Sequence, residues 1–245
     1  MRAIILAAGR GSRMQAATAD RPKGLVEVAG VALLDRQIAA LRAAGAEDIG
    51  VVTGYRGEMM ATRSLTRFHN PRWAETNMVA SLTAATDWLR SGPCLVSYSD
   101  IFYRPEAPLA LARAEADMAI TYDPHWLGLW QRRFADPLSD AETFRLAADG
   151  SLTDIGAKPH SLAEVEGQYM GLLRFTPLGW EAVEAVLAGL DPARRDRLDM
   201  TSLLRLLLAA GQRIAALAAP WPWGEVDSET DRALYESMPV EFGLG

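Results

Sequence analysis

The chain has 245 residues, of which 49% are hydrophobic and 23% are charged, which is enough for one large α/β domain with a sizeable core. Its 25 Lys and Arg stand against 31 Asp and Glu, and the formal net charge of −6 argues against a protein that wraps nucleic acid. The single cysteine, Cys94, excludes an intrachain disulfide and suits a reducing cytoplasm.

The apolar segments are short. None approaches the roughly 20 residues of a membrane-spanning helix. The N-terminal apolar run ends at Gly9, before it reaches the roughly 7–15 residues of a signal-peptide core. We therefore expect a cytoplasmic chain without membrane insertion.

Strand-like and helix-like segments alternate along the chain. The first half predicts strands over 2–8, 48–54, 94–100 and 116–123, with helices over 33–45 and 76–92. The second half predicts a hairpin over 143–156, a strand over 166–176, helices over 177–190 and 199–211, strands over 212–219 and 223–226, and a helix over 228–238. The alternation favours a single Rossmann-like domain, with helices in three α/β/α layers around a mixed, mostly parallel sheet.

The first predicted strand runs straight into a glycine-rich loop, in the string LAAGRGSRM. In open α/β sheets, ligands bind beyond the carboxyl ends of the strands, which is where this loop lies. Gly9 and Gly11 allow close backbone approach, and their amides suit phosphate oxygens. Positive charge comes from Arg10, Arg13 and Lys23. This combination predicts a phosphate-binding loop.

Two common nucleotide motifs do not fit this loop. A P-loop needs G-x-x-x-x-G-K-[ST], and the sequence contains no such string. The Rossmann dinucleotide fingerprint needs a third small residue where Met14 stands, and the second strand ends in VVTGY without an acidic ribose partner. A nicotinamide-dependent oxidoreductase is therefore disfavoured.

The longer string resembles the signature L-x-x-G-x-G-[TS]-R followed by P-K, found in nucleotidyltransferases that join an NTP to a phosphorylated sugar or alcohol. The matching residues are Leu6, Gly9, Gly11, Ser12, Arg13, Pro22 and Lys23. The resemblance implies a nucleotide-diphospho-sugar transferase-like fold. It also implies catalytic roles for Arg13 and Lys23, which would offset charge on the α-phosphate and the departing pyrophosphate. Nucleotide contacts are expected from Leu6, Ala7, Ala8, Gly9, Arg10, Gly11, Ser12, Arg13, Lys23, Gly54, Asn77, Ser81 and Asp100.

Two aspartates occupy the places where this family binds a metal. Asp100 ends the string SYSD after a predicted strand, and Asp227 follows another in GEVDSETD. The resemblance implies that both are catalytic and hold Mg²⁺ against the phosphates, since hard oxygen ligands suit this ion. Alternatively, Asp227 only caps the last helix. Glu225 and Asp231 are interpreted as solvated or structural.

The helix after the second strand looks like that of CTP-dependent cytidylyltransferases, which act on phosphocholine, aminoethylphosphonate and related small amines. Their N-x-x-x-S-L pattern is matched by Asn77, Ser81 and Leu82, although Asn77 also fits a simple helix start. Over most of the chain, including the strings TNM, SYSD and QYMGL, the sequence resembles a subgroup that joins CTP to phosphorylated glutamine for phosphoramidate modification of capsules. The resemblance implies that residues 1–100 mainly bind the nucleotide, whereas 101–245 bind the acceptor and supply the second metal ligand.

Two kinds of acceptor site remain open. A quaternary ammonium would need an aromatic cage, which Tyr122, Trp126, Trp130 and Tyr169 could supply unless the tryptophans pack on the core. A glutamyl-type acceptor would need charged partners such as Arg132, Arg133, Lys158 and Glu166. Acceptor contacts are therefore expected from Trp130, Arg133, Lys158, Glu166 and Tyr169.

The resulting hypothesis is a Mg²⁺-dependent cytidylyltransferase that transfers CMP from CTP to a small phosphorylated or phosphonate acceptor. Pyrophosphate leaves, and the product is a CDP-activated intermediate for modification of a cell-surface polysaccharide. One alternative is a sugar-1-phosphate nucleotidyltransferase that uses UTP or dTTP, and another is a regulatory module that binds a nucleotide without reaction. Family members often pair, which makes a homodimer an option.

Overall fold

The structure is a computed structural model that describes residues 1–11, 14 and 18–244. Its seven-stranded central sheet has the order β12-β8-β11-β6-β1-β4-β5. These strands are β1 (Arg2–Ala7), β4 (Asp48–Thr53), β5 (Thr66–His69), β6 (Cys94–Tyr98), β8 (Met118–Asp123), β11 (Gln168–Phe175) and β12 (Ala215–Ala218). Neighbouring strands are parallel except at β11, which is antiparallel to both β6 and β8. The predicted mixed, mostly parallel sheet is confirmed.

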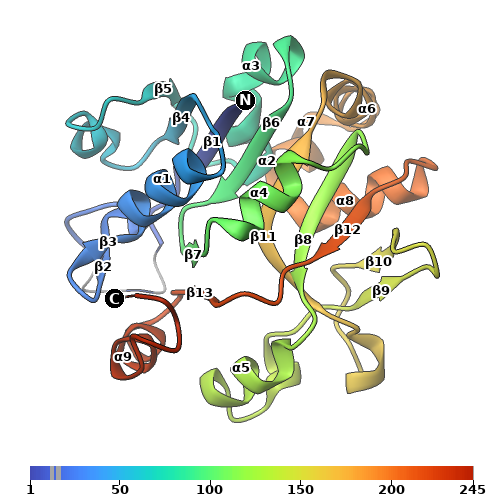
Figure 1. Cartoon of the computed structure of the whole chain (residues 1–245). Coiled ribbons are helices and arrows are strands. Elements are labelled where there is room, and N and C mark those ends of the chain that lie inside the picture. The colour runs from blue at the N-terminus through green and yellow to red at the C-terminus, as the bar shows by residue number, and fades with distance from the viewer. Residues whose placement is uncertain (12–13, 15–17, 245) are drawn as a thin grey trace.

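Helices cover both faces of this sheet (Figure 1). The helices of the described residues are α1 (Leu33–Ala43), α2 (Met78–Leu82), α3 (Thr86–Ser91), α4 (Glu106–Ala112), α5 (Trp126–Arg133), α6 (Pro177–Ala188), α7 (Pro192–Arg197), α8 (Met200–Ala209) and α9 (Glu229–Ser237), of which α5 and α9 lie beyond the sheet. Helices α1 and α4 pack together on one side, and α2, α6 and α8 pack on the other. The expected three α/β/α layers are therefore present.

The core forms where the strands are most apolar. In β1, Ala3, Ile4 and Ile5 have no exposed surface, as expected of a parallel strand covered by helices on both faces. The smaller strand pairs lie outside this sheet. They are β2 (Glu27–Val28) with β3 (Val31–Ala32), β7 (Ile101–Tyr103) with β13 (Trp223–Glu225), and β9 (Phe144–Leu146) with β10 (Leu152–Ile155).

Several elements differ from the sequence prediction. The single helix expected over 76–92 is divided by a 3₁₀ turn at Thr83–Ala85, where the Thr83 hydroxyl donates to the carbonyl of Ala80 at 2.7 Å. The strand expected over 94–100 stops at Tyr98 and resumes as β7. Helices α4, α5 and α7 were not among the predicted elements. They have six to eight residues, too few for a clear helical period.

The strand order reverses direction between β1 and β6, which positions the site. From β1 the chain moves outward to β4 and β5, and it then returns to β6 on the other side of β1. A crevice at the carboxyl ends of two such strands is the usual ligand site of an open α/β sheet. The glycine loop follows β1, and Asp100 follows β6, so both lie at this crevice.

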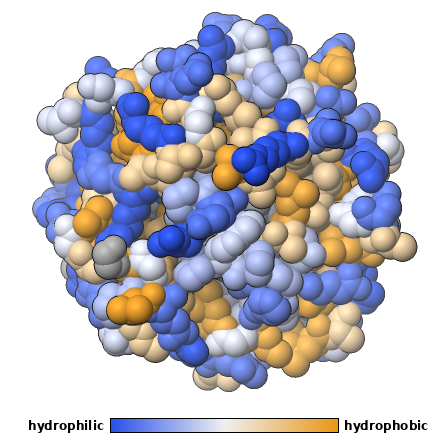
Figure 2. Space-filling model, in the orientation of Figure 1, coloured by the Kyte–Doolittle hydropathy of each residue, from blue (hydrophilic) through white to orange (hydrophobic). Residues whose placement is uncertain are grey.

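Polar and apolar residues are intermixed on the face of the molecule in Figure 2. Within the part of the chain that the structure describes, no helix combines the length and apolar character needed to span a bilayer.

Candidate active site

The loop after β1 and the segment containing Lys23 lie against each other. Gly11 has a φ of +72°, and a Cβ built on it would lie 2.8 Å from the Cβ of Lys23, so a larger residue would be strained here. The Thr18 hydroxyl donates to the carbonyl of Gly11 at 2.9 Å, which ties the two ends of the loop together. The predicted residues Ser12 and Arg13 lie outside the described residues.

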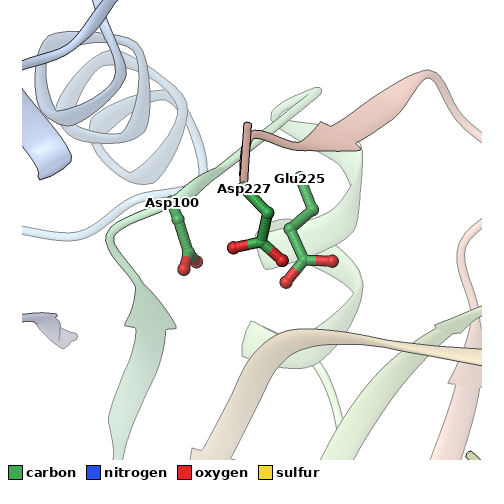
Figure 3. A group of neighbouring side chains, drawn as sticks. All are labelled: Asp100, Glu225 and Asp227. Carbon is green, nitrogen blue, oxygen red and sulfur yellow. The ribbon is translucent and has the colours of Figure 1, made fainter. Parts of the chain in front are cut away.

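The antiparallel pair of β7 and β13 brings the two aspartates together. Glu225 is in register with Ile101, and the amide of Val226 donates to the carbonyl of Asp100 at 2.9 Å. Segments more than 120 positions apart in the sequence are thereby joined at the end of β6. Figure 3 shows the carboxylates of Asp100, Glu225 and Asp227 turned toward a common space.

Three carboxylates form this cluster, one more than the sequence predicted. One oxygen from each of Asp100, Glu225 and Asp227 lies within 4.8 Å of the others. Glu225 was interpreted as solvated or structural, and the structure shows its side chain 23% exposed and facing the aspartates. The alternation of side chains along a strand was the available signal, because residues i and i+2 project to the same side.

Lys23 lies among these carboxylates. Its Nζ is 2.9 Å from Asp100 Oδ2 and also forms an ion pair with Asp227, and its side chain is only 9% exposed. Burial alone would lower the pKa of Lys23, but the charges of Asp100 and Asp227 outweigh burial and raise it. The ammonium is therefore fully charged at neutral pH.

Arg133 forms ion pairs with two carboxylates of the cluster, Glu225 and Asp227. Its side chain has no exposed surface and contacts Glu225 at 3.2 Å, Asp231 at 2.9 Å and Asp227 at 4.0 Å. Asp231 is therefore structural, as one of the two interpretations had it, but it is buried rather than solvated. Burial and the neighbouring Asp227 raise the pKa of Glu225 to about 8.

The cap of α9 resolves the alternative role of Asp227. Ser228 is the N-cap residue, and its hydroxyl accepts from the amide of Asp231 while the Asp231 carboxylate accepts from the Ser228 amide. Asp227 is thus not the capping residue, and its carboxylate is directed to the cluster.

The donor set fits a divalent metal ion. All three groups offer hard carboxylate oxygens, which Mg²⁺ prefers. Asp100 Oδ1 is buried and has no hydrogen-bond partner, so one oxygen of the cluster is left for a further ligand. Asp100 and Asp227, the predicted ligands, are both in the group, and Glu225 adds a third carboxylate.

A cavity of about 330 Å³ opens beside the glycine loop. Of the predicted nucleotide contacts, those that line it are Leu6, Ala8, Gly9, Gly11, Lys23, Asn77, Ser81 and Asp100. The lining also includes residues that the sequence did not single out, namely Trp73, Thr76, Met78, Tyr98 and Ser99. Trp73 and Thr76 lie just before Asn77, the N-cap of α2. Their position next to a predicted nucleotide contact was the feature of the sequence that could have identified them.

Three other predicted nucleotide contacts, Ala7, Arg10 and Gly54, belong to the described residues and do not line this cavity. Ala7 is buried in β1, whereas Arg10 is exposed and lies over the ring of Tyr55. Gly54 is needed for close packing, because a Cβ there would lie 2.6 Å from the carbonyl oxygen of Ala8. Asn77 is the N-cap of α2, accepting from the amide of Met78, and it still faces the cavity.

A second cavity of about 300 Å³ adjoins the carboxylate cluster. It shares Met78 and Tyr98 with the first cavity, and Glu225 and Asp227 with the cluster. Its remaining walls are Asp140, Glu142, Gln168, Tyr169, Met170, Gly171, Asp199, Met200, Thr201 and Trp223.

Of the five predicted acceptor contacts, only Tyr169 lines this second cavity. Trp130 has no exposed surface and packs between Trp126, Phe134 and Trp223, so the interpretation of the tryptophans as core residues is the one that fits. Arg133 has no exposed side-chain surface, pairs with Glu225 and does not line this cavity.

The two remaining predicted contacts make local backbone bonds at the surface. Exposed Lys158 donates to the carbonyls of Leu138 and Ser139, and exposed Glu166 accepts from the amide of Leu146. Neither of them lines the second cavity.

Residues 3–159 match a family described as the MobA-like NTP transferase domain. The chain belongs to this family. It is 33% identical to the CTP:phosphoglutamine cytidylyltransferase of Campylobacter jejuni, over 94% of this chain and 97% of that protein. It is 32% identical to the bifunctional IPC transferase and DIPP synthase of Rubrobacter xylanophilus, over 96% of this chain and 51% of that protein.

The fold is also that of a solved nucleotidyltransferase. The inositol-1-phosphate CTP transferase from T. maritima superposes with a TM-score of 0.77 and 20% identity, covering 97% of this chain and 94% of that one. The predicted resemblance to nucleotidyltransferases of the cytidylyltransferase type is therefore confirmed, as is the nucleotide-diphospho-sugar transferase-like fold.

Proposed function

We propose that this NTP transferase is a cytidylyltransferase, which transfers CMP from CTP to a small phosphorylated or phosphonate acceptor and releases pyrophosphate. One observation carries the proposal: a glycine loop, the Lys23 ammonium and three carboxylates meet at the border of two adjoining cavities. Cytidylyl transfer is favoured over other transfers by the relative from C. jejuni, which matches over nearly the whole length of both chains.

The two substrates are assigned to the two cavities. All residues that line the first cavity fall between Leu6 and Asp100, whereas the second is lined mainly by residues between Asp140 and Asp227. We assign the first to CTP and the second to the acceptor. This assignment agrees with the expected split at residue 100, with Met78 and Tyr98 as shared walls.

The chain's own groups would then act on charge and position. An acceptor phosphate is ionised at neutral pH and needs no general base to attack the α-phosphorus in line. Lys23 and the loop amides would stabilise charge as it moves onto pyrophosphate, with Arg13 as the second expected cation. Asp100, Glu225 and Asp227 would hold Mg²⁺, which supplies positive charge to the phosphates when it is bound.

The test is pyrophosphate release with each of CTP, UTP, dTTP, ATP and GTP, crossed against an amine-type phosphate, a phosphonate and a sugar 1-phosphate, with and without Mg²⁺. Release with CTP and a non-sugar acceptor is the expected result. Release only with UTP or dTTP and a sugar 1-phosphate would instead support a sugar-1-phosphate nucleotidyltransferase. Binding without release under every condition would favour a regulatory module.

A further inference from the structure

The second cavity carries information about the acceptor, and this inference rests on the proposed function. An acceptor whose phosphate meets CTP beside Asp227 must place the rest of its structure in this cavity of about 300 Å³. The side chains that line the cavity therefore select the acceptor.

The walls of this cavity are strongly acidic. Five carboxylates line it, and none of its described lining residues is Lys, Arg or His. Glu225 and Asp227 already pair with Lys23 and Arg133 on their far side. Such a surface favours a cationic ligand and repels an anionic one.

Glu142 and Asp199 are the members of this wall with capacity left for a ligand. Neither forms an ion pair with a basic side chain of the described residues, and the hydroxyl of Thr201 lies 3.4 Å from one oxygen of each. One oxygen of Asp199 also accepts from the amide of Ser202, as the N-cap of α8. Burial and the like charges of Asp199 and Asp140 raise the pKa of Glu142, and a bound cation would relieve this repulsion.

Of the four residues expected to form a cage for a quaternary ammonium, only Tyr169 lines this cavity. Trp126 and Trp130 are buried in the core. The rings of Tyr98 and Tyr169 meet edge to face, with centroids 5.9 Å apart at 89°, so they pack against each other. The indole N–H of Trp223 is directed to Asp123 at 2.9 Å.

A primary ammonium fits the remaining groups better. It carries three N–H donors, each of which needs an acceptor when it is withdrawn from water, whereas a trimethylammonium has none. Glu142, Asp199, Gln168 and Thr201 line the same cavity, and each has a side-chain oxygen that can accept a hydrogen bond. We infer that the acceptor carries a primary ammonium group, bound by Glu142 and Asp199, at the end opposite its phosphate or phosphonate.

The first experiment compares acceptors that differ in this group alone. At saturating CTP and Mg²⁺, kcat/KM is measured for phosphoethanolamine, phosphocholine and 2-hydroxyethyl phosphate. Phosphoethanolamine is expected to exceed the other two by at least about tenfold, the scale of one charge-assisted hydrogen bond. Phosphonate and phosphorylated-glutamine arms then distinguish the possible sources of the ammonium.

Two variants connect the preference to the named carboxylates. Glu142→Gln and Asp199→Asn remove charge while keeping size, and asparagine retains the N-cap of α8. Each is expected to raise KM for amine acceptors by about 10- to 100-fold and to leave KM for CTP unchanged. Glu181→Gln, an exposed change of the same kind on α6, is the matched control.

The outcomes separate the two proposals. A preference for phosphocholine or a neutral acceptor, or an unchanged acceptor KM in both variants, would overturn the inference and leave cytidylyl transfer standing. No pyrophosphate release with any nucleotide and any acceptor would overturn the proposed function, and this inference with it.

Discussion

Lys23 offers the sharpest test, because it contacts the proposed metal ligands and lines the nucleotide cavity. In Lys23→Ala, turnover is expected to fall by about 10²–10³, the scale for one preorganised electrostatic group. The change also leaves Asp100 and Asp227 without their shared ammonium. The exposed fractions of these two side chains are 21% for Asp100 and 11% for Asp227. Because both are largely buried, the free energy of unfolding without metal should fall by about 3–5 kcal/mol. The loss is smaller to the extent that water reaches Asp100.

Mg²⁺ distinguishes these effects from a general loss of packing. In Lys23→Ala, the ion meets carboxylates that no ammonium holds, so Mg²⁺ should raise the melting temperature more than it does in the wild type. The assay is thermal unfolding across a Mg²⁺ titration, beside steady-state pyrophosphate release. Arg90→Ala is the control, since Arg90 pairs with a single carboxylate at the exposed surface. Wild-type turnover, or equal Mg²⁺ shifts in both proteins, would refute the reasoning.

Three further predictions concern metal, pH and the thiol. Asp227→Asn should keep the far-ultraviolet circular dichroism of the wild type but lose Mg²⁺-dependent activity, and an unchanged metal requirement would remove Asp227 from the ligand set. Because the pKa of Glu225 is raised to about 8 in the folded state, its contribution to stability is present below its ordinary value near 4.5 and is lost as pH rises through 8. Melting temperatures in EDTA should show this decline in the wild type and a weaker one in Glu225→Gln. Burial raises the pKa of Cys94 to about 11, so the native protein should not react with a thiol reagent at pH 8, whereas the denatured chain should.

The nucleotide half of the site was predictable because its signals are local. Glycines directly after a buried strand, and an aspartate at the end of another, place a loop and a carboxylate at one edge of a parallel sheet without knowledge of the rest of the fold. Alternation of strands and helices predicted the mixed, mostly parallel sheet but not its strand order. Gly9 and Lys23 were found from the loop itself and Asp100 from the resemblance to nucleotidyltransferases, and all three line one cavity.

The acceptor half was not predictable in the same way. Asp140, Glu142 and Asp199 come from segments with no motif, and only the packing of α8 beside β10 and the neighbouring loop gathers them. The Trp126 and Trp130 spacing fits a buried helix face and a ligand cage equally well, because periodicity reports which side chains share a face and not what covers it. The sequence likewise did not show whether Arg133 contacts the acceptor or lies elsewhere, because the sequence does not show what covers a charged side chain.

The position of Lys23 connects the two halves of the site through charge balance. Its ammonium offsets Asp100 and Asp227, and among the described residues that line the nucleotide cavity it is the sole basic side chain. A triphosphate in that cavity would compete with the carboxylates for the same ammonium. If Lys23 turns to the phosphates, the carboxylates lose a positive charge that only another cation can replace. Nucleotide and divalent ion are therefore expected to bind cooperatively, since each supplies the partner that the other displaces.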